Sequence, residues 1–462
     1  MAANDLVRGA TDVTKENDMS KRIGFISTRF AGTDGVSLEA AKWAQVLEQE
    51  GHACFWFAGE LDRCADQSYL APEAHFHHGQ IAHISENVFG KTRRDPDITD
   101  LIHSLRATLK NKLREFIREF RIDLLIVQNA MTIPMNIPLG LALAEIISEA
   151  QIPTIAHHHD FYWERNRYAI NAVGEFLPMA FPADLPPVRH VVINSPAQRD
   201  LAHRRGLAAT LIPNVLDFDQ PPQVQPGEIK RFRQAIGLAP DDLMVLQPTR
   251  LIKRKGIEHV IELVKGLAHL RCKLVISHED GDEGTGYSDW LQSAARNNGV
   301  DIRLVTEKVV SPWRETTAGK GQFSLWTVYA AADLITFCSL YEGFGNGLLE
   351  AIYFKKPVIL NRYETFISDI EPLGFEFITL DGYLTAEVVT AARRVLRGGD
   401  ETYAGPERNF AIARRHFSYQ VLRQRLQSVM DALPGASMPG LPGHPPRCVS
   451  PAYEDTPVKL AV

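Results

Sequence analysis

The stretch SLYEGFGNGLLEAIYFKKP, residues 339–357, contains the pattern that decides the fold prediction. It follows an apolar run, residues 332–338, that is typical of a buried strand. Glycines between residues 343 and 347 then mark the junction with a helix that is expected to begin near Asn346. A strand, a glycine-rich turn and a helix N-terminus form an anion-binding layout, because free backbone N–H groups and the positive helix end both favour phosphate.

Two acidic residues in the same stretch, Glu342 and Glu350, have seven residues between them. Carboxylates beside a phosphate would repel it, so we expect them to accept hydrogen bonds from hydroxyl groups. A ligand with both phosphate and hydroxyl groups, such as a nucleotide sugar, would satisfy both features. The alternative is an ordinary strand-to-helix turn with solvated glutamates, and this stretch alone favours neither interpretation.

The rest of the chain alternates apolar strands with amphipathic helices, which predicts an α/β protein. Strands are expected at residues 22–27, 54–58, 123–128, 153–156, 188–194 and 210–213, and again at 243–247, 273–277, 302–305, 332–338, 357–360 and 376–379. A chain of 462 residues is too long for one ordinary core. We therefore predict two Rossmann-like, doubly wound domains that face a central crevice.

The domain boundaries follow from composition. We expect a disordered tail at residues 1–20, an acceptor-binding domain at 21–220, a Pro- and Gln-rich linker at 221–228, a nucleotide-sugar-binding domain at 229–415, a C-terminal helix at 416–432 that packs back on the first domain, and a Pro- and Gly-rich disordered tail at 433–462.

The overall composition excludes several classes of function. The net charge is −6, so no global basic field for nucleic acid is present. The five cysteines have no CxxC spacing, which indicates reduced thiols rather than a disulfide framework. The first 21 residues contain no apolar signal-peptide core, and we find no apolar run long enough to span a bilayer. A cytoplasmic protein without a transmembrane segment is expected.

The combined motifs resemble those of the retaining GT-B glycosyltransferases of family 4. The residues that carry the resemblance are PTRLIKRKGIE at 248–258, ADLITFCSLYEGFGNGLLEA at 332–351 and KKPVI at 355–359, together with GTDGVSLEAAKW at 32–43 and IPNVLDF at 212–218. The resemblance spans about residues 22–430. It implies the GT-B fold and transfer of a hexose from a nucleotide-diphosphate sugar.

The chain also departs from the family pattern. Ser277-His278 stands where a strand usually ends in glycine, Lys355-Lys356-Pro357 replaces G-K-P, and Asn361-Arg362-Tyr363 replaces a glycine-bearing turn. These changes affect the residues expected to set base and sugar specificity. HHHDFYWER, residues 157–165, and NRYETFISDIEPLGF, residues 361–375, are similar to a mannosylglucosylglycerate-synthase-like subgroup.

Arg250 and Lys255 follow a predicted strand end and are the candidates for a diphosphate clamp. A cation pair stabilises the negative charge that grows on a leaving diphosphate, whereas Lys253 and Arg254 are expected at the surface. The resemblance assigns Glu342 to hydroxyls of the transferred sugar and Glu350 to the ribose, where the helix N-terminus is expected to keep it ionised. The further donor-binding candidates are Gly35, Gly343, Phe344, Gly345, Asn346, Gly347 and Leu348.

His159 is expected in a strand-end loop that faces the crevice, and it matches the active-site histidine of the family. It could bind the sugar or the acceptor; the alternative is a structural histidine, because His157 and His158 cannot both face the ligand with it. The other acceptor-binding candidates are Asp160, Tyr162, Arg165 and Arg167. Either arginine could hold an acidic acceptor by a bidentate contact, but each alone could equally be an exposed residue.

The chain contains two groups of possible metal ligands. Asp280 and Asp282 have the DxD form that binds Mg²⁺ in another glycosyltransferase fold, although a solvated acidic loop fits better after a Rossmann-type strand. Four histidines, His75, His77, His78 and His83, lack convincing ligand spacing for zinc and are expected in a surface loop. No metal is therefore required, and Mg²⁺ remains an option.

The sequence predicts a retaining hexosyltransferase with GDP-mannose or UDP-glucose as donor. The acceptor would be a hydroxyl of a small soluble compound, which could be anionic and similar to glucosylglycerate. In such an enzyme the departing phosphate oxygen takes the acceptor proton, so no carboxylate nucleophile is expected. The alternatives are an inverting GT-B transferase with a catalytic base on the first domain, and a non-catalytic protein that binds nucleotide sugars.

Overall fold

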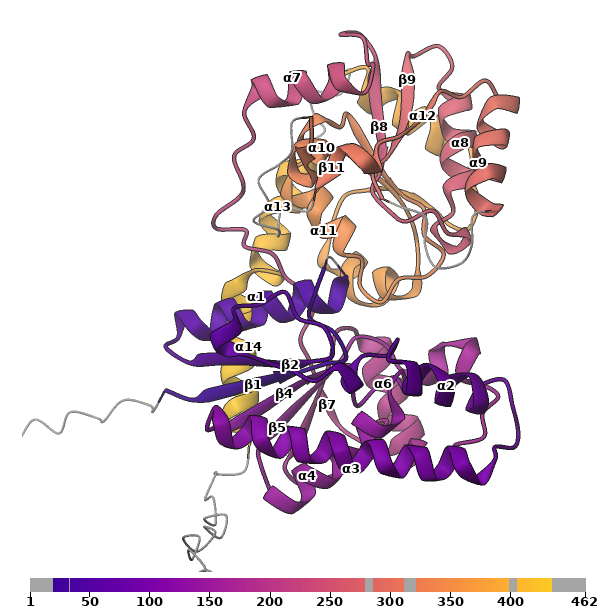
Figure 1. Ribbon diagram of the computed structural model, residues 1–462. Coiled ribbons are helices and arrows are strands. Elements are labelled where there is room, and N and C mark those ends of the chain that lie inside the picture. Colours follow the sequence, from indigo (N-terminus) through magenta and orange to yellow (C-terminus); the bar gives the residue numbers. More distant parts are fainter. Residues whose placement is uncertain (1–19, 33, 279–285, 311–320, 399–404, 434–462) are drawn as a thin grey trace, which may run out of the picture.

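The computed structural model describes residues 20–32, 34–278, 286–310, 321–398 and 405–433. Two α/β domains lie one above the other, each built around a parallel sheet (Figure 1). The predicted fold class is therefore observed. Most of the two predicted tails, residues 1–19 and 434–462, lies outside the described residues.

The first domain contains a seven-stranded parallel sheet in the order β3-β2-β1-β4-β5-β6-β7. Its strands are β1 (Arg22–Ile26), β2 (Ala53–Ala58), β3 (Ser68–Leu70), β4 (Leu124–Gln128), β5 (Thr154–His158), β6 (Val188–Val192) and β7 (Ala209–Leu211). The central strands β4 and β5 are buried along their whole length because helices cover both faces of the sheet. Strand β5 continues to His158, two residues beyond the predicted end.

The helices of this domain are α1 (Gly35–Gln49), α2 (Gly79–Val88), α3 (Pro96–Glu119), α4 (Ile137–Ala150), α5 (Leu177–Ala180) and α6 (Ser195–Arg205). Short polar side chains cap the starts of three of these helices, α1, α4 and α6. Asp34 caps α1 by accepting hydrogen bonds from the N–H groups of Val36 and Ser37. Asn136 caps α4 in the same way, and Asn194 caps α6. His83, predicted in a surface loop, lies on α2.

The connection between the domains is shorter than predicted. Helix α7 (Pro226–Ala235) begins inside the expected linker, residues 221–228. Proline is favoured in the first turn of a helix because its missing N–H would have no partner there. The Pro- and Gln-rich composition therefore marked the connection correctly but hid the start of the next helix.

The second domain contains a six-stranded parallel sheet in the order β10-β9-β8-β13-β14-β15. Its strands are β8 (Leu243–Gln247), β9 (Cys272–Ile276), β10 (Ile302–Leu304), β13 (Leu334–Phe337), β14 (Val358–Asn361) and β15 (Ile378–Leu380), and β11 (Val309–Val310) pairs separately with β12 (Phe323–Ser324). The remaining helices are α8 (Ile257–Gly266), α9 (Gly286–Asn297), α10 (Leu325–Ala331), α11 (Asn346–Tyr353), α12 (Ala386–Leu396), α13 (Gly405–His416) and α14 (Tyr419–Asp431). Helix α13 was not predicted.

Helix α14 returns to the first domain. Its buried residues Leu422, Leu426 and Val429 share one apolar cluster with Trp43 of α1 and with the sheet. Helices α1 and α14 thus cover one face of the first sheet, while α3 and α4 cover the other. In Figure 1 the yellow α14 lies beside the first domain, directly below α13, the helix that precedes it in the chain.

Both sheets place their ligand-binding edge at the domain junction. In the first sheet, the strand order reverses between β1 and β4, and in the second between β8 and β13. Ligands of open α/β sheets bind beyond the carboxyl ends of the strands at such reversals. The loop after β13 approaches the loop after β5, because a Cβ placed on Gly343 would lie 3.4 Å from the carbonyl oxygen of His159.

A buried ion pair attaches the connection to α1. Lys42 Nζ lies 2.6 Å from Glu39 Oε2 and donates to the carbonyl of Val215 at 2.8 Å, while Glu39 Oε1 accepts from the N–H of Val215 at 3.0 Å. Both side chains are almost fully buried. Each charge is therefore paired and hydrogen-bonded, which is the condition under which buried charges are tolerated.

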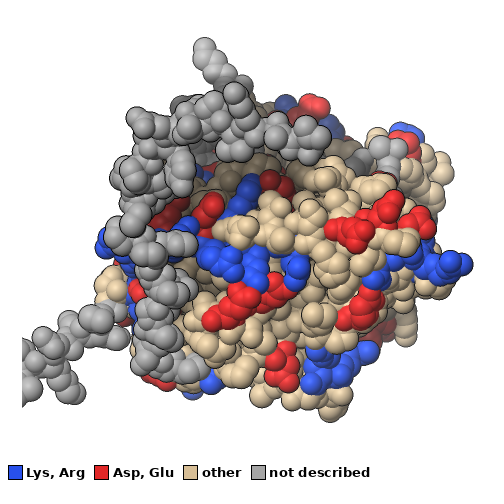
Figure 2. All heavy atoms as spheres, turned by 60° about the horizontal axis from the view of Figure 1, so that its bottom comes forward, with Lys and Arg blue, Asp and Glu red and all other residues tan. Residues whose placement is uncertain are grey.

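The surface carries no single-sign field on the face shown in Figure 2, where basic and acidic side chains are interspersed. No helix of the described chain combines the length and apolar content that a membrane crossing demands.

The buried pair generates a stability prediction. Lys42→Met should lower the free energy of unfolding by about 3–5 kcal/mol, because Glu39 would remain buried without its cation. Glu39→Gln in the same chain should recover part of this loss. Urea denaturation followed by tryptophan fluorescence measures both changes.

The matched control is the exposed pair of Asp200 and Arg204, 3.4 Å apart on α6. Asp200→Asn should cost less than about 0.5 kcal/mol, because exposed pairs at this spacing contribute little. A Lys42→Met cost equal to that of the control would show that the buried pair does not stabilise the fold.

Candidate active site

The glycine loop, residues 339–345, joins β13 to α11 at the carboxyl edge of the second sheet. Gly345 has φ +106°, and a Cβ at this position would lie 2.6 Å from the hydroxyl oxygen of Tyr363. Both the backbone conformation and the space therefore require glycine. Helix α11 begins at Asn346, as predicted, so the loop leads directly into the N-terminus of this helix.

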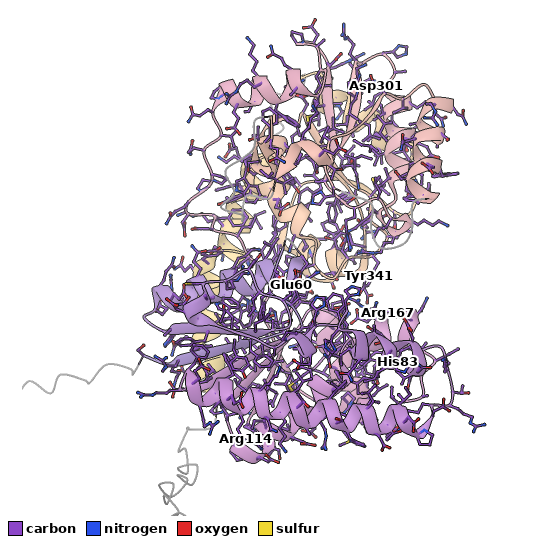
Figure 3. The ribbon with its side chains drawn as sticks, in the orientation of Figure 1. Glu60, His83, Arg114, Arg167, Asp301 and Tyr341 are labelled. Atoms are coloured by element: carbon purple, nitrogen blue, oxygen red, sulfur yellow. The ribbon has the colours of Figure 1, made fainter. Side chains whose placement is uncertain are left out.

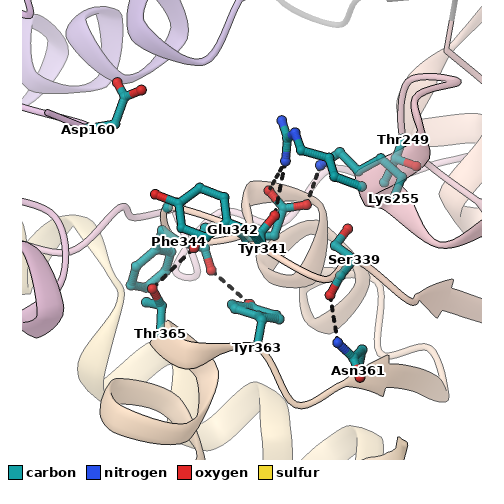
Figure 4. A network of polar contacts seen from close by, with 12 residues as sticks. Asp160, Thr249, Lys255, Ser339, Tyr341, Glu342, Phe344, Asn361, Tyr363 and Thr365 are labelled. Carbon is teal, nitrogen blue, oxygen red and sulfur yellow. Dashed lines mark hydrogen bonds and ion pairs between the residues drawn. The ribbon is translucent and has the colours of Figure 1, made fainter. Parts of the chain in front are cut away.

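Lys255 and Glu342 form a contact at the centre of the junction. The Lys255 ammonium contacts Glu342 Oε1, and only 7% of the lysine is exposed. Burial lowers the pKa of Lys255, while the Glu342 carboxylate raises it. Figure 4 shows this contact beside the glycine loop. The predicted clamp lysine is thus paired with the predicted sugar-binding glutamate.

Arg254 is a second cation on Glu342, although the sequence placed it at the surface. Its guanidinium lies 3.7 Å from Glu342 Oε2 and donates to the carbonyl of Tyr341 at 3.0 Å. Residues Lys253–Lys255 form a 3₁₀ turn, in which successive side chains point about 120° apart. Arg254 and Lys255 nevertheless both reach Glu342, while Lys253 remains exposed. A run of basic residues without periodicity gave no signal for this.

Arg250 and His278 lie within electrostatic range of Lys255. Arg250 is exposed, and its charge is close enough to lower the pKa of both Lys255 and His278. His278 follows β9, and burial lowers its pKa to about 4. His278 is therefore a neutral ring close to the charges of Lys255 and Arg250. The sequence singled it out as a departure from the family pattern without assigning it a role.

Glu350 lies on the second turn of α11 and accepts a hydrogen bond from the hydroxyl of Tyr329 at 2.6 Å. Tyr329 belongs to α10 and is fully buried, so the bond is shielded from water. Burial raises the pKa of Glu350, whereas the Tyr329 bond lowers it. This direction differs from the expectation that the helix N-terminus would dominate. Tyr329 was missed because it looks like an ordinary core residue of an amphipathic helix.

His159 follows β5 and faces the second domain through its carbonyl oxygen. Its backbone N–H donates to Asn129 Oδ1 at 2.9 Å, and its Nε2 lies 3.0 Å from Gln128 Oε1. Because an amide oxygen only accepts, Nε2 carries the proton and Nδ1 carries the lone pair. Burial lowers the pKa of His159 to about 4 against the opposing charge of Asp34, so the ring is neutral.

The neighbouring histidines point into the first domain, as their alternation predicts. His157 stacks on Trp43 at 4.1 Å and lies 2.9 Å from Gln128 Oε1. His158 Nε2 lies 2.9 Å from His190 Nδ1. Both are fully buried, and burial lowers both pKa values well below the ordinary range.

The predicted acceptor residues do not act as one group. Asp160 forms an ion pair with Arg165, which occupies that guanidinium. Arg167 is exposed, and its guanidinium lies 4.6 Å from the centre of the Tyr168 ring. Tyr162 packs instead against the apolar cluster between α2 and α3. Arg165 and Arg167, for which the sequence predicted the same role, therefore have different partners in the structure.

A contact between the domains passes through Tyr341. Its hydroxyl donates to Glu164 Oε2, which belongs to the segment that follows His159. Figure 3 places Tyr341 and Arg167 at the domain junction. Glu164 also accepts from the N–H of Phe161 at 2.7 Å. The residue beside Glu342 is thus tied to the candidate acceptor segment.

Two helix N-termini converge at the junction. Gly35 begins α1, and a Cβ placed on it would lie 3.8 Å from Asn346 Nδ2 at the start of α11. Asn346 Oδ1 accepts from Asn214 Nδ2 at 2.6 Å. The positive ends of both helices can act on one anion placed between them. This brings the predicted residues Gly35 and Asn346 together from different domains.

The metal candidates remain untested. Asp280 and Asp282 lie outside the described residues. Among the described residues, no group of three or more His, Cys, Asp or Glu side chains is arranged to hold a metal ion.

Comparison with known proteins agrees with this architecture. Residues 33–220 match the model of glycosyltransferase family 4. The chain is 32% identical to mannosylglucosylglycerate synthase of Thermotoga maritima over 439 residues, which cover 88% of this chain and 98% of that protein. It is 31% identical to a protein of the same name from Petrotoga mobilis, over 78% of this chain and 86% of that protein.

Solved structures confirm the GT-B fold. A glycosyltransferase from Rickettsia africae superimposes with a TM-score of 0.65 at 13% identity, covering 91% of this chain and all of that one. HepE of Anabaena, solved with UDP and glucose, gives a TM-score of 0.59 at 16% identity, covering 89% of this chain and all of that one.

The raised pKa of Glu350 predicts how stability depends on pH. The folded state binds the carboxyl proton of Glu350 more tightly than the unfolded state does. The stabilisation that this proton gives to the fold is therefore fully present below the unfolded pKa of about 4.3, and it is lost as pH rises through the folded pKa. Glu350→Gln should therefore unfold at a higher temperature than the wild type at pH 8. The difference should shrink towards pH 4 in thermal unfolding followed by circular dichroism.

Glu387→Gln is a control with the opposite sign. The Thr385 side chain and the backbone lower the pKa of Glu387. The ionised carboxylate of Glu387 therefore stabilises the fold above the unfolded pKa, and this stabilisation is lost at lower pH. A Glu350→Gln variant that is less stable than the wild type at pH 8 would contradict the direction given for its pKa.

Proposed function

The chain belongs to glycosyltransferase family 4, and we propose that it is a retaining mannosyltransferase that uses GDP-mannose and a small anionic acceptor similar to glucosylglycerate. Its hexosyltransferase class follows from the family and its curated relatives. The relatives are named for a product that contains mannose, glucose and glycerate, which supports both the donor sugar and the acid group. UDP-glucose is the second donor to compare.

The observation that carries the proposal is the buried contact between Lys255 and Glu342 beside the glycine loop. A lysine that is desolvated and paired with a carboxylate can exchange this partner for another anion. The diphosphate of a donor would attract the ammonium away from Glu342. The carboxylate would then be free to accept hydrogen bonds from hydroxyls of the sugar.

The cations around the site would stabilise the leaving group. When the bond between the anomeric carbon and the phosphate oxygen breaks, negative charge accumulates on the diphosphate. Lys255 and Arg250, together with the N-termini of α1 and α11, would surround this charge. Interactions that strengthen as charge develops lower the barrier to the chemical step.

The proton needs no separate carboxylate base in this scheme. The acceptor oxygen bonds to the anomeric carbon on the face that the diphosphate leaves, and its proton passes to the departing phosphate oxygen. His159 is neutral, and its Nδ1 lone pair could accept a hydrogen bond from a hydroxyl of the sugar or acceptor. A neutral histidine beside the reacting carbon adds no charge that would repel a developing cation.

Glu350 would bind the nucleoside. Tyr329 occupies Oε2 of this carboxylate, which leaves Oε1 and the second lone pair of Oε2 for the ribose hydroxyls. Because Tyr329 is buried, it also fixes the direction of the carboxylate. This arrangement agrees with the role that the family resemblance implies for Glu350.

The acceptor would lie on the side of Arg167. Arg165 is occupied by Asp160, whereas no carboxylate of the described chain forms an ion pair with Arg167. A guanidinium that presents a planar fork suits a carboxylate such as that of glycerate. We therefore assign the acid group of the acceptor to Arg167 rather than to Arg165.

Replacing the buried lysine tests the site. Lys255→Met should lower kcat at least about 100-fold, because one fixed charge at the leaving group is typically worth this much. Transfer is measured by GDP release from GDP-mannose in the presence of glucosylglycerate. Lys253→Met is the matched control, since this neighbouring lysine is exposed and should leave kcat within about twofold. Equal activity of both variants would contradict the assignment.

The stereochemistry and donor are tested with the wild-type chain. GDP-mannose should raise the unfolding temperature more than UDP-glucose at equal concentration, because a ligand stabilises the state to which it binds. The product should have the same anomeric configuration as the donor, which NMR of the anomeric position determines. Inverted product would require a catalytic base instead. Binding without transfer to any anionic sugar acceptor would indicate a non-catalytic protein.

A further inference from the structure

Three side chains of residues 361–365 donate hydrogen bonds to backbone carbonyls of the glycine loop. Asn361 Nδ2 donates to the carbonyl of Ser339 at 3.0 Å, Tyr363 Oη donates to that of Phe344 at 2.8 Å, and Thr365 Oγ1 donates to that of Glu342 at 3.1 Å. The donors lie at alternating positions at the end of β14 and just beyond it (Figure 4). They follow β14 directly, next to the strand that leads into the loop.

These donors are held firmly in place. Asn361, Tyr363 and Thr365 are each less than 5% exposed. The Asn361 amide is oriented at both ends, because its Oδ1 also accepts from the N–H of Gly382 at 2.8 Å. The Tyr363 ring packs between Phe337 and Phe366, with ring centres 6.1 and 6.0 Å away. Buried and satisfied donors of this kind restrict the backbone groups to which they bond.

The direction of each carbonyl determines the direction of the next N–H. In a trans peptide the C=O and the following N–H point in opposite directions. The peptide after Ser339 follows this rule, since its carbonyl accepts from Asn361 while the N–H of Leu340 donates to the carbonyl of Arg254 at 2.8 Å. The carbonyls of Glu342 and Phe344 point to Thr365 and Tyr363, so the next two N–H groups point away from the buried segment.

Those two N–H groups belong to Gly343 and Gly345. Neither donates a hydrogen bond within the described part of the chain. Gly343 faces the other domain, where a Cβ would lie 3.4 Å from the carbonyl of His159, and its own carbonyl accepts from Asn194 Nδ2 at 2.6 Å. Two unpaired donors therefore belong to the loop that lines the domain junction.

We propose that Asn361, Tyr363 and Thr365 are positioning residues, which aim the N–H groups of Gly343 and Gly345 at the diphosphate of the donor. This rests on the proposed function. It also assigns a role to the segment in which the chain departs from the glycine-bearing turn of its family. The three side chains act through the loop and do not touch the donor.

The physical reason is that a loop rich in glycine does not hold its own shape. Glycine gives the backbone the positive φ and the space that Gly345 needs, but it also leaves many other conformations accessible. Donors fixed from behind remove these alternatives before the ligand binds, so the N–H groups need no reorganisation when charge develops on the leaving group. Gly345 in turn leaves room for the Tyr363 hydroxyl.

The experiment compares variants that remove one donor and keep the shape of the side chain. Tyr363→Phe and Thr365→Val remove the two hydroxyls, and Thr365→Ser restores one of them. Tyr353→Phe is the matched control, because Tyr353 is also buried and donates to main-chain carbonyls, those of Asp217 and Gln220, away from the loop. Calorimetry measures binding of GDP, UDP, GMP and UMP, and steady-state kinetics measures transfer.

Tyr363→Phe and Thr365→Val should each bind the preferred nucleoside diphosphate about fivefold to tenfold more weakly, as expected for one lost hydrogen-bond contribution. The affinity for the corresponding monophosphate should stay unchanged, since only the second phosphate reaches the loop. In both variants kcat should fall, because the aimed N–H groups act most strongly on the charge of the transition state. Thr365→Ser and Tyr353→Phe should behave as the wild type.

Two results would overturn the inference while leaving the function standing. In one, both variants bind the diphosphate as tightly as a wild type that transfers sugar. In the other, diphosphate and monophosphate affinities fall equally, which would show a merely structural role. A wild-type chain that binds neither GDP nor UDP would overturn the proposed function, and the inference with it. Thermal unfolding of each variant identifies a loss that results from unfolding.

Discussion

The buried ion pair of Glu39 and Lys42 is the constraint on which the geometry of the junction depends. Both charged groups bond to the backbone of Val215, so the chain that leaves the first domain is held against α1. Asn214, one residue earlier, then bonds to Asn346 at the start of α11. The N-termini of α1 and α11 are thereby brought to the same place, although 311 residues separate Gly35 from Asn346.

The charged side chains at this junction have one another as partners in the structure, and other charged groups could replace those partners. Lys255 and Arg254 both pair with Glu342 in the structure described, which keeps the buried lysine and the carboxylate compatible with folding. In the proposed function, an incoming diphosphate would offer the cations a second partner, and the sugar hydroxyls would offer one to the carboxylate. His278, close to Lys255 and Arg250, is a neutral ring and adds no charge to this group. Stability and ligand binding thus use the same groups.

Much of the fold was predictable, because buried parallel strands and capped helices leave local patterns. Strand β8 has the predicted bounds, and α11 begins at the predicted residue. The errors arose where local pattern and packing diverge. The start of α7 was hidden in a proline-rich segment, and α13 has polar residues over most of its surface. The partnership of Arg254 with Glu342 depends on a 3₁₀ turn and on a strand 80 residues away.

The sequence by itself determined the fold class, the family resemblance and the residue types at the site, since these depend on periodicity and on motifs a few residues long. Only the tertiary structure decided which side chains meet. It paired Lys255 with Glu342 and bonded Tyr329 to Glu350. It also gave Arg165, but not Arg167, a carboxylate partner, and it bonded Tyr363 to the carbonyl that precedes Gly345. The physical reason is that these contacts join strands, helices and loops whose separation along the chain carries no information about their distance in space.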